Sequence, residues 1–370
     1  MDVLPESGPH SSMTNAPLDA IPSTWRPPTA PESRNYPYHC WWVAGFSTEI
    51  RRELLGRWLL DTPVLLYRTE DGRVVALENR CPHRGAPLSR GTLQGDHVQC
   101  GYHGFTFGAD GACVRVPSMK SPPAAVRVRT FPVIEQWPFV WVYLGDPARI
   151  DDVPPPHRLE WATDTSFATV HGRIDVAANY MLLKENVLDL THFGFVHAST
   201  FKITDWVDPP SCTTEGDVTS YHQSFKRSPL PPVFAEPLGV PVGTPFNREN
   251  YGAFVSPALQ IAAVDLIDPD REEIVGRFRI SHATTPIDAT HMHYFWVGGR
   301  DYGTTAEQMA EFEALTRKGF AEDEAMLEAV QEIMSRDPRG AAAPEVSVKA
   351  DTAAVQARRI VQRWMARETG

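Results

Sequence analysis

Short apolar runs separated by turn residues fill the part of the chain that follows Tyr38. Four runs are rich in the β-branched and aromatic residues typical of strands, and they are Trp41–Val43, Val64–Arg68, Val74–Leu77 and Phe139–Tyr143. The dipeptides Asp71-Gly72 and Asp110-Gly111 are typical of hairpin turns. This pattern predicts a small all-β domain, a sandwich or a barrel, over residues 37–150.

The pattern changes to longer periodic segments in residues 151–370. Helices are expected around Tyr180–Val196, Thr305–Ser335 and Ala350–Arg367, with strands between the first two. This order of elements predicts an α+β domain with an antiparallel sheet. The segment Asp151–Pro156, which ends in three prolines, is typical of a linker between the two domains.

Proline also marks two further segments. Residues 1–36 contain seven prolines among small polar residues, and this composition predicts a disordered or extended tail. The stretch from Lys226 to Tyr251 is rich in proline and apolar residues and predicts a long loop, and loops of that length are usually lids or disordered segments.

Composition places the chain among soluble globular proteins, with 42% apolar and 22% charged residues. A net charge of −11 and the lack of any Lys or Arg run argue against nucleic-acid binding. The sequence has no stretch of 18 apolar residues that could span a membrane, and its start lacks a secretory signal. Cys40, Cys113 and Cys212 are odd in number and scattered, which favours reduced thiols and a cytoplasmic location.

Two pairs of metal-binding residues stand close together in the first domain. Cys81-Pro-His83 is followed, after sixteen residues, by Cys100-Gly-Tyr-His103. Two thiolates and two imidazoles are the ligands of a Rieske [2Fe–2S] centre, in which the cysteines hold one iron and the histidines the other. Neutral imidazoles raise the reduction potential to roughly −150 to +300 mV, against about −400 mV for all-cysteine plant-type clusters. Such a cluster accepts an electron and passes it on.

A Cys2His2 zinc site is the nearest alternative, because zinc uses the same ligand types. Zinc fingers usually place the two cysteines in one pair and the two histidines in another, whereas each pair here mixes one of each. Gly85, Gly101 and Gly104 beside the ligands let the backbone approach closely and direct N–H groups at sulfur, which favours the cluster.

A second metal site is predicted within Glu185–His197. An undisturbed helix would turn His192 and His197 apart by about 140°, so both bind one metal only if the helix ends between them, and we expect this at Gly194. Asp189 would share a helix face with His192. Two histidines and a carboxylate form the facial triad of non-haem Fe(II) enzymes, which activate O2. The alternative is a structural histidine pair beside an apolar helix.

The remaining ligand must come from another part of the chain, and Asp323 is the candidate. Met326, Leu327 and Val330 follow it at +3, +4 and +7, so that Asp323 is expected on the buried stripe of its helix. An ionised carboxylate that faces the core is costly unless it is paired or metal-bound. A charge near a helix N-terminus and a buried ion pair are the alternatives.

Four motifs together resemble the Rieske non-haem iron oxygenases, and they are CPHRGAPLS, CGYHGF, ENVLDLTHFGFVH and AEDEAMLEA. Within this family the chain is similar to the oxygenase components of the phthalate dioxygenase, vanillate O-demethylase and dicamba O-demethylase group. The resemblance extends from Tyr38 to the C-terminal helix. It implies an α+β protein with an N-terminal all-β Rieske domain and a C-terminal helix-grip domain, in which an antiparallel sheet wraps around a long helix.

The resemblance also implies roles for individual residues. The expected ligands are Cys81, His83, Cys100 and His103 for the cluster, and His192, His197 and Asp323 for a mononuclear iron. Asn186 matches an asparagine close to the iron. His282 falls where relatives place a substrate-contacting histidine, with a core histidine on a strand face as the alternative.

Asp189 matches the family's bridging carboxylate, which links a cluster histidine of one subunit to an iron histidine of its neighbour. A carboxylate that accepts N–H bonds from His103 and His192 would fix both tautomers and shorten the electron path. The bridge implies a homotrimer with head-to-tail contacts. We find no dinucleotide-binding fingerprint, so a separate NAD(P)H-dependent reductase or a ferredoxin is expected to supply the electrons.

The expected function is that of a terminal oxygenase component that uses O2 for oxidative O- or N-dealkylation of a hydrophobic aromatic substrate. The few cations near the proline-rich stretch, Lys226, Arg227 and Arg248, give weak support for an anionic substrate. Ring mono- or dihydroxylation by the same machinery is the first alternative. A Rieske electron carrier without oxygenase activity is the second, and it leaves the whole second domain without a purpose.

Overall fold

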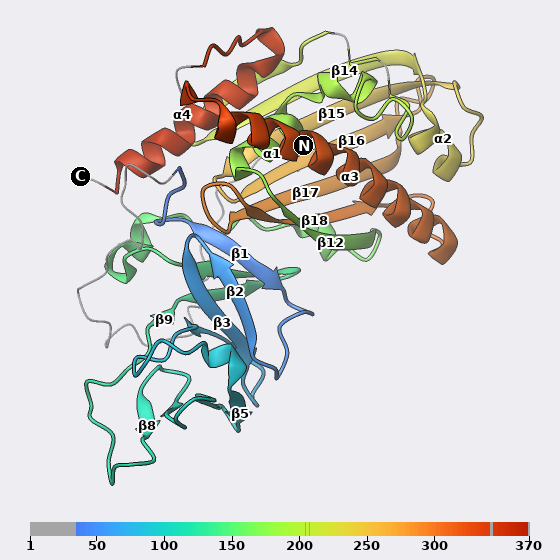
Figure 1. Cartoon of the computed structure of the whole chain (residues 1–370). Coiled ribbons are helices and arrows are strands. Elements are labelled where there is room, and N and C mark those ends of the chain that lie inside the picture. Colours follow the sequence, from blue (N-terminus) through green and yellow to red (C-terminus); the bar gives the residue numbers. More distant parts are fainter. Residues whose placement is uncertain (1–34, 204, 207, 341–342, 369–370) are drawn as a thin grey trace. The chain divides into compact units, whose positions relative to one another are not determined.

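The computed structural model describes residues 35–203, 205–206, 208–340 and 343–368. The predicted tail, residues 1–36, lies outside these residues except for its last two positions. The described chain forms two compact units (Figure 1). The N-terminal unit comprises residues 35–158 with Thr285–Ala289, and the C-terminal unit comprises Leu159–Thr284 with residues 290–368.

The N-terminal unit is all-β and contains three small antiparallel sheets. The first contains β1 (Trp41–Phe46), β11 (Phe139–Tyr143) and β10 (Val133–Gln136), in that order. The second contains β2 (Leu55–Leu59), β3 (Thr62–Arg68), β4 (Val74–Glu78) and β9 (Thr130–Phe131). The third contains β5 (Thr92–Gln94), β6 (His97–Gln99), β7 (Thr106–Phe107) and β8 (Cys113–Arg115). The four predicted strands are confirmed, and both predicted hairpin turns join consecutive antiparallel strands.

The C-terminal unit contains one seven-stranded antiparallel sheet with the order β12-β18-β17-β16-β15-β14-β13. Its strands are β12 (Ala168–Val176), β13 (Ser211–Glu215), β14 (Val218–Pro229), β15 (Pro245–Ser256), β16 (Leu259–Ile267), β17 (Ile274–Pro286) and β18 (Met292–Arg300). Its helices are α1 (Tyr180–Leu188), α2 (Pro232–Leu238), α3 (Ala306–Arg336) and α4 (Thr352–Ala366). Among the described residues no helix combines the length and the apolar content needed to cross a membrane.

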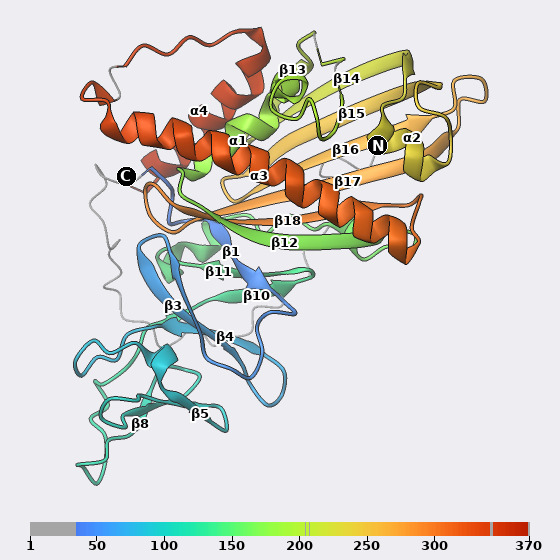
Figure 2. The same cartoon turned by 45° about the vertical axis from the view of Figure 1, so that its right-hand side comes forward.

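Helix α3 is the long helix of this unit and runs across one face of the sheet (Figures 1 and 2). Its 31 residues extend over about 46 Å. A capping box between Thr305 and Gln308 fixes its start. Its buried face packs on the sheet through ring contacts such as that of Phe320 with Tyr294, whose centroids are 5.2 Å apart. The helix-grip arrangement expected from the family resemblance is therefore confirmed.

The prediction of a long loop from Lys226 to Tyr251 is wrong. This stretch holds the end of β14, helix α2 and the start of β15. Three of its prolines lie where a missing N–H is tolerated, since Pro229 ends β14, Pro232 begins α2 and Pro245 begins β15, whereas Pro237 lies inside α2. Proline content in this stretch is therefore compatible with regular elements, because three of the prolines mark their ends.

Candidate functional site

The two segments that carry the Cys/His pairs of the N-terminal unit have the same backbone hydrogen bonds. In the first, Gly85 N–H donates to the Cys81 carbonyl at 2.8 Å, and in the second, Gly104 N–H donates to the Cys100 carbonyl at 3.0 Å. Both glycines have left-handed backbone angles, with φ of 73° and 70°. A side chain would be strained in this conformation, so glycine closes each loop around its ligands.

The four predicted cluster ligands separate into a thiol pair and an imidazole pair. Cys81 and Cys100 are buried in one apolar cluster, each 2% exposed, whereas the His83 and His103 rings are exposed and lie 4.5 Å apart. Burial raises the pKa of the Cys81 thiol to about 11, so a thiolate there depends on a bound metal. This separation fits a two-iron cluster with sulfur on one iron and nitrogen on the other.

A single zinc ion fits these four residues less well. In the part of the chain that the structure describes, one group of three or more His, Cys, Asp or Glu residues has its donor atoms within 4.8 Å of one another. That group lies in the C-terminal unit and does not include these four residues. Four ligands of one tetrahedral ion would have to lie closer together than that.

The α-helix that precedes the two histidines of the C-terminal unit ends earlier than expected. Helix α1 ends at Leu188 and does not continue to Val196. Asp189 is extended at the end of the helix, and its Oδ1 accepts hydrogen bonds from Thr191 N–H at 2.9 Å and Thr191 Oγ1 at 2.7 Å. These bonds start a 3-10 turn over Leu190–Gly194. The 3-10 turn ends at Gly194, between the two histidines, where the break was predicted. Asp189 and His192 do not share one α-helix, because α1 ends before both.

The turn brings His192 and His197 together with Asp323 of α3. Oδ1 of Asp323 lies 3.7 Å from Nε2 of His192 and 3.2 Å from Nε2 of His197. One donor atom from each residue lies within 4.8 Å of the other two. His197 is 1% and Asp323 5% exposed, and Asn186 Nδ2 donates to Asp323 Oδ1 at 3.1 Å. Two imidazoles and one carboxylate on one side of a metal fit an iron centre with open positions.

Both histidines have hydrogen-bond partners on their Nδ1 atoms, which leaves each Nε2 directed at Asp323. Nδ1 of His192 bonds the backbone carbonyl of Asp189 at 2.6 Å, and Nδ1 of His197 bonds Glu322 Oε2 at 2.9 Å. Thr200 Oγ1 donates to the other oxygen of Glu322. Partners of this kind fix the tautomer and the ring orientation of metal-binding histidines.

The contact between Asp189 and His192 differs from the one that the resemblance implies. His192 Nδ1 bonds the backbone carbonyl of Asp189 and not the Asp189 carboxylate. Among the described residues, the second carboxylate oxygen, Oδ2, has no hydrogen-bond partner. The carboxylate is therefore held by Thr191 on one side and open on the other.

Electrostatics differ between the two histidines. Burial lowers the pKa of His192, and this favours the neutral imidazole that binds a metal. Burial also acts to lower the pKa of His197, but the hydrogen bond and the charge of Asp323 outweigh it and raise the pKa. A cation at this position would replace the proton that the Asp323 carboxylate attracts.

Helix α3 presents Asp323 to this site, but its buried stripe is not the one predicted. Met326 and Val330 are 50% and 38% exposed, and only Leu327 of the three is buried. The stripe around Asp323 instead includes Thr316, Phe320 and Leu327. Glu322 was also missed, because its partner His197 is 125 residues away in the sequence.

An apolar cavity of about 140 Å³ adjoins the two histidines and Asp323. Its walls come from α1, α2, α3, the sheet strands β14 to β18 and the segment after α1. His282 lines it from β17, and its Nδ1 is hydrogen-bonded to the Tyr294 hydroxyl at 2.6 Å. Burial lowers the pKa of His282 to about 3, so the imidazole is neutral. His282 is thus both buried and part of the cavity wall.

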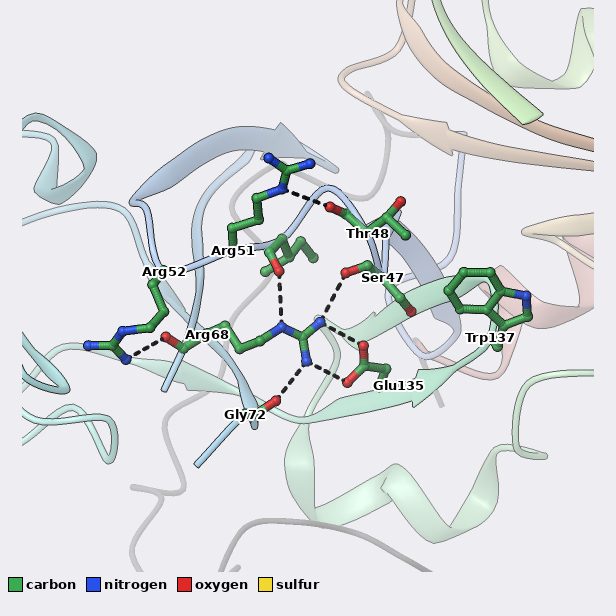
Figure 3. A pocket seen from close by; sticks show the side chains of 9 residues that line it. Ser47, Thr48, Arg51, Arg52, Arg68, Gly72, Glu135 and Trp137 are labelled. Carbon is green, nitrogen blue, oxygen red and sulfur yellow. Dashed lines mark hydrogen bonds and ion pairs between the residues drawn. The ribbon is translucent and has the colours of Figure 1, made fainter. Parts of the chain in front are cut away.

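A second hollow, of about 650 Å³, lies on the N-terminal unit beside Arg68 and Trp137 (Figure 3). All five N–H donors of Arg68 are used there, in bonds to Glu135 and to the carbonyls of Ser47, Ile50 and Gly72. The arginine therefore ties neighbouring loops together and has no donor left for a ligand.

Replacement of Glu322 is expected to weaken iron binding. Glu322→Ala removes the partner of His197 Nδ1, and losses of this kind typically cost about 10- to 100-fold in metal affinity or activity. The measurement is the iron retained by the purified protein in competition with a chelator. Glu324→Gln, a neighbouring carboxylate of α3 outside the site, is the control and should keep the parent's iron. Equal retention by Glu322→Ala and the control would show that the glutamate does not support the site.

Comparisons with known proteins agree with this geometry. Residues 40–135 match the Rieske [2Fe-2S] domain family, and residues 176–367 match the vanillate O-demethylase oxygenase C-terminal domain family. The chain is 34% identical to the toluene-4-sulfonate monooxygenase system iron-sulfur subunit of Comamonas testosteroni, over 90% of this chain and 98% of that protein. It is 31% identical to a vanillate O-demethylase oxygenase subunit of Pseudomonas sp. (strain HR199 / DSM 7063), over 90% and 96% of the two chains.

A solved structure is similar over nearly the whole chain. The crystal structure of dicamba monooxygenase with non-heme iron and dicamba has a TM-score of 0.75 and 28% sequence identity, and the match covers 89% of this chain and 97% of that one. Both units therefore have the same fold as a protein that binds non-haem iron and dicamba.

Proposed function

Because this chain belongs to the Rieske oxygenases that carry the vanillate O-demethylase oxygenase C-terminal domain, we propose that it removes an O- or N-alkyl group from an aromatic substrate by oxidation. It is the oxygenase component of a multicomponent monooxygenase and uses a [2Fe–2S] cluster, a mononuclear iron and O2. The observation that carries the proposal is the position of His192, His197 and Asp323 beside an apolar cavity.

The ligand roles follow from the donor sets. Cys81 and Cys100 would hold one iron of the cluster, His83 and His103 the other, and His192, His197 and Asp323 the separate iron. When bound, the two groups supply one-electron transfer and O2 activation. Asn186 holds the Asp323 carboxylate, while Glu322 and the Asp189 carbonyl hold the two imidazoles. These bonds fix the iron ligands before substrate enters.

The cavity walls position the substrate and exclude water. Side chains such as Phe193, Phe234, Ile280 and Phe320 line it. Its volume of about 140 Å³ is close to that of apolar protein cavities that hold one benzene ring. A single aromatic ring therefore fits, with an alkyl substituent directed at the iron ligands. Water exclusion protects a reactive site from side reactions.

Electrons are expected to arrive from a separate reductase or ferredoxin and to pass between subunits of a homotrimer. The open Oδ2 of Asp189 supports this, because it can accept an N–H bond from a cluster histidine of a neighbouring chain. The Asp189 carbonyl already bonds His192, so one residue would contact ligands of both metal sites. Ring hydroxylation by the same machinery is the alternative outcome of the chemistry.

Product analysis separates dealkylation from ring hydroxylation. The chemically reduced protein is mixed once with labelled O2 and 4-methoxybenzoate, so that no reductase is needed. We expect 4-hydroxybenzoate and formaldehyde in equal amounts, since one oxygen atom enters the methyl carbon and the other, with two electrons and two protons, leaves as water. A cis-diol that keeps the methoxy group and carries two labelled oxygens would contradict the proposal.

A further inference from the structure

A buried cation stands in the wall of the apolar cavity. Arg248 of β15 is 1% exposed and lines the cavity. Its guanidinium lies 4.4 Å from the centroid of the Phe225 ring and 5.9 Å from that of Phe234. The two other cations of this region, Lys226 and Arg227, are exposed and pair with Glu249 and Asp270 outside the cavity. Arg248 is therefore the cation that a ligand in the cavity can meet.

The hydrogen-bonding capacity of Arg248 is not used up by its protein partners. One terminal nitrogen pairs with the Asp205 carboxylate, and the buried Nε has no hydrogen-bond partner among the described residues. Arg68 of the N-terminal unit differs from Arg248, because all five of its N–H donors are bonded to protein acceptors (Figure 3). Burial lowers the pKa of Arg248 despite the charge of Asp205. Asp205, whose side chain is 30% exposed, thus compensates the buried charge only in part.

A second unused donor lies beside the first. Asn250 is two residues further along β15 and therefore faces the same side of the sheet, about 7 Å away along the strand. It is 2% exposed and lines the cavity, and its Nδ2 has no hydrogen-bond partner within the described residues. Buried donors are nearly always paired in native proteins, so two unpaired ones in a cavity wall point to a ligand that accepts hydrogen bonds.

These donors and the iron ligands lie toward opposite ends of the cavity. Arg248 packs near Phe234, which contacts Phe278, which in turn contacts Phe312 of α3. Phe312 precedes Asp323 by eleven residues, or about 16 Å along the helix. His282 and Phe320 line the end near Asp323. A ligand that reaches both ends must carry its acceptor group far from its reacting group.

We propose that Arg248 and Asn250 form an oxyanion subsite that binds a carboxylate or sulfonate substituent of the aromatic substrate, on the side of the ring remote from the group that is removed. This inference rests on the proposed function for the identity of the reacting group. A planar guanidinium can give two parallel N–H bonds to such an oxyanion, and Asn250 Nδ2 can give a third. The apolar walls then hold the ring, and the subsite determines that the group to be removed points toward the iron ligands.

The test compares matched acids and amides by calorimetric titration of the holoenzyme without electrons. The probes are 4-methoxybenzoate and 4-methoxybenzamide, and 4-methoxybenzenesulfonate and its sulfonamide. The parent is expected to bind one acid or both at least about tenfold more tightly than the neutral analogue, as charge-assisted bonds imply. The more tightly bound acid identifies the oxyanion.

Variants then assign this preference to the subsite. Arg248→Met should bring the acid-to-amide ratio close to one, and Asn250→Ala should lower it in part. Arg279→Met is the matched control, because Arg279 pairs with Asp265 on the same sheet but alternates with the cavity-lining residues of β17. This control should keep the parent's ratio. Should Arg248→Met not fold, the parent's ratio and that of Asn250→Ala still decide the question.

Equal binding of acids and amides by the parent, or no saturable binding of either acid, would overturn the subsite. An unchanged ratio in Arg248→Met would do the same. The proposed function fails separately. Preferential binding of the acid without loss of the methyl group retains the subsite and refutes dealkylation, whereas equal demethylation of acid and amide retains dealkylation and refutes the subsite.

Discussion

Asp189→Asn is expected to keep both metal sites filled and to lower turnover by about 10- to 100-fold. Asparagine can still accept the bonds from Thr191, and the backbone carbonyl that holds His192 is unchanged. What it loses is the negative charge at Oδ2, the atom that we expect to accept an N–H bond from a neighbouring subunit's cluster histidine. The measurement is the rate of substrate-dependent O2 consumption, together with iron content.

Thr191→Ala is the control for this variant. It removes one of the two bonds to Asp189 Oδ1 but leaves the carboxylate charge in place. A small loss of turnover in Thr191→Ala beside a large one in Asp189→Asn assigns the effect to the charge. Parent-like turnover of Asp189→Asn would rule out the bridging role.

Asp323→Ala should abolish turnover and lower the iron content while the cluster remains. The substitution removes the only carboxylate among the three clustered donors and leaves His192 and His197 as a pair. Two neutral imidazoles hold a hard divalent iron less well than the full facial set. The cluster ligands belong to the other unit, so the Rieske electron paramagnetic resonance signal should be that of the parent.

Glu324→Gln serves again as the control, because it changes a carboxylate one residue from Asp323 that is no part of the site. It should retain iron and turnover. Retention of full activity by Asp323→Ala would mean that another group completes the iron site.

The local parts of both sites could be predicted from sequence. The Cys81 and Cys100 loops are short and closed by glycine, so residue order alone fixes which side chains meet. Strands and long helices were likewise predictable, because their apolar patterns are local. The predicted end of α1 was wrong by several residues. The Asp189 side chain forms capping bonds that end the helix, and the apolar pattern of the sequence carries no sign of these bonds.

The contacts between distant segments could not be predicted. Glu322 meets His197 across 125 residues. Arg248 lines a cavity whose other walls come from segments distant in the sequence, such as α1 and α3. Met326 and Val330 follow a helical period but are exposed, because the stripe of α3 that faces the sheet includes Phe320 and Asp323. Which stripe is buried depends on the sheet, and the helix sequence alone does not determine it.

The metal and sulfide content of the purified chain tests the central claim most directly, that one chain carries a Rieske cluster and a separate iron. We predict about three irons and two inorganic sulfides per chain, no stoichiometric zinc, and a Rieske signal that accounts for two of the irons. Two irons per chain with a full Rieske signal, or zinc in place of either iron centre, would contradict the account.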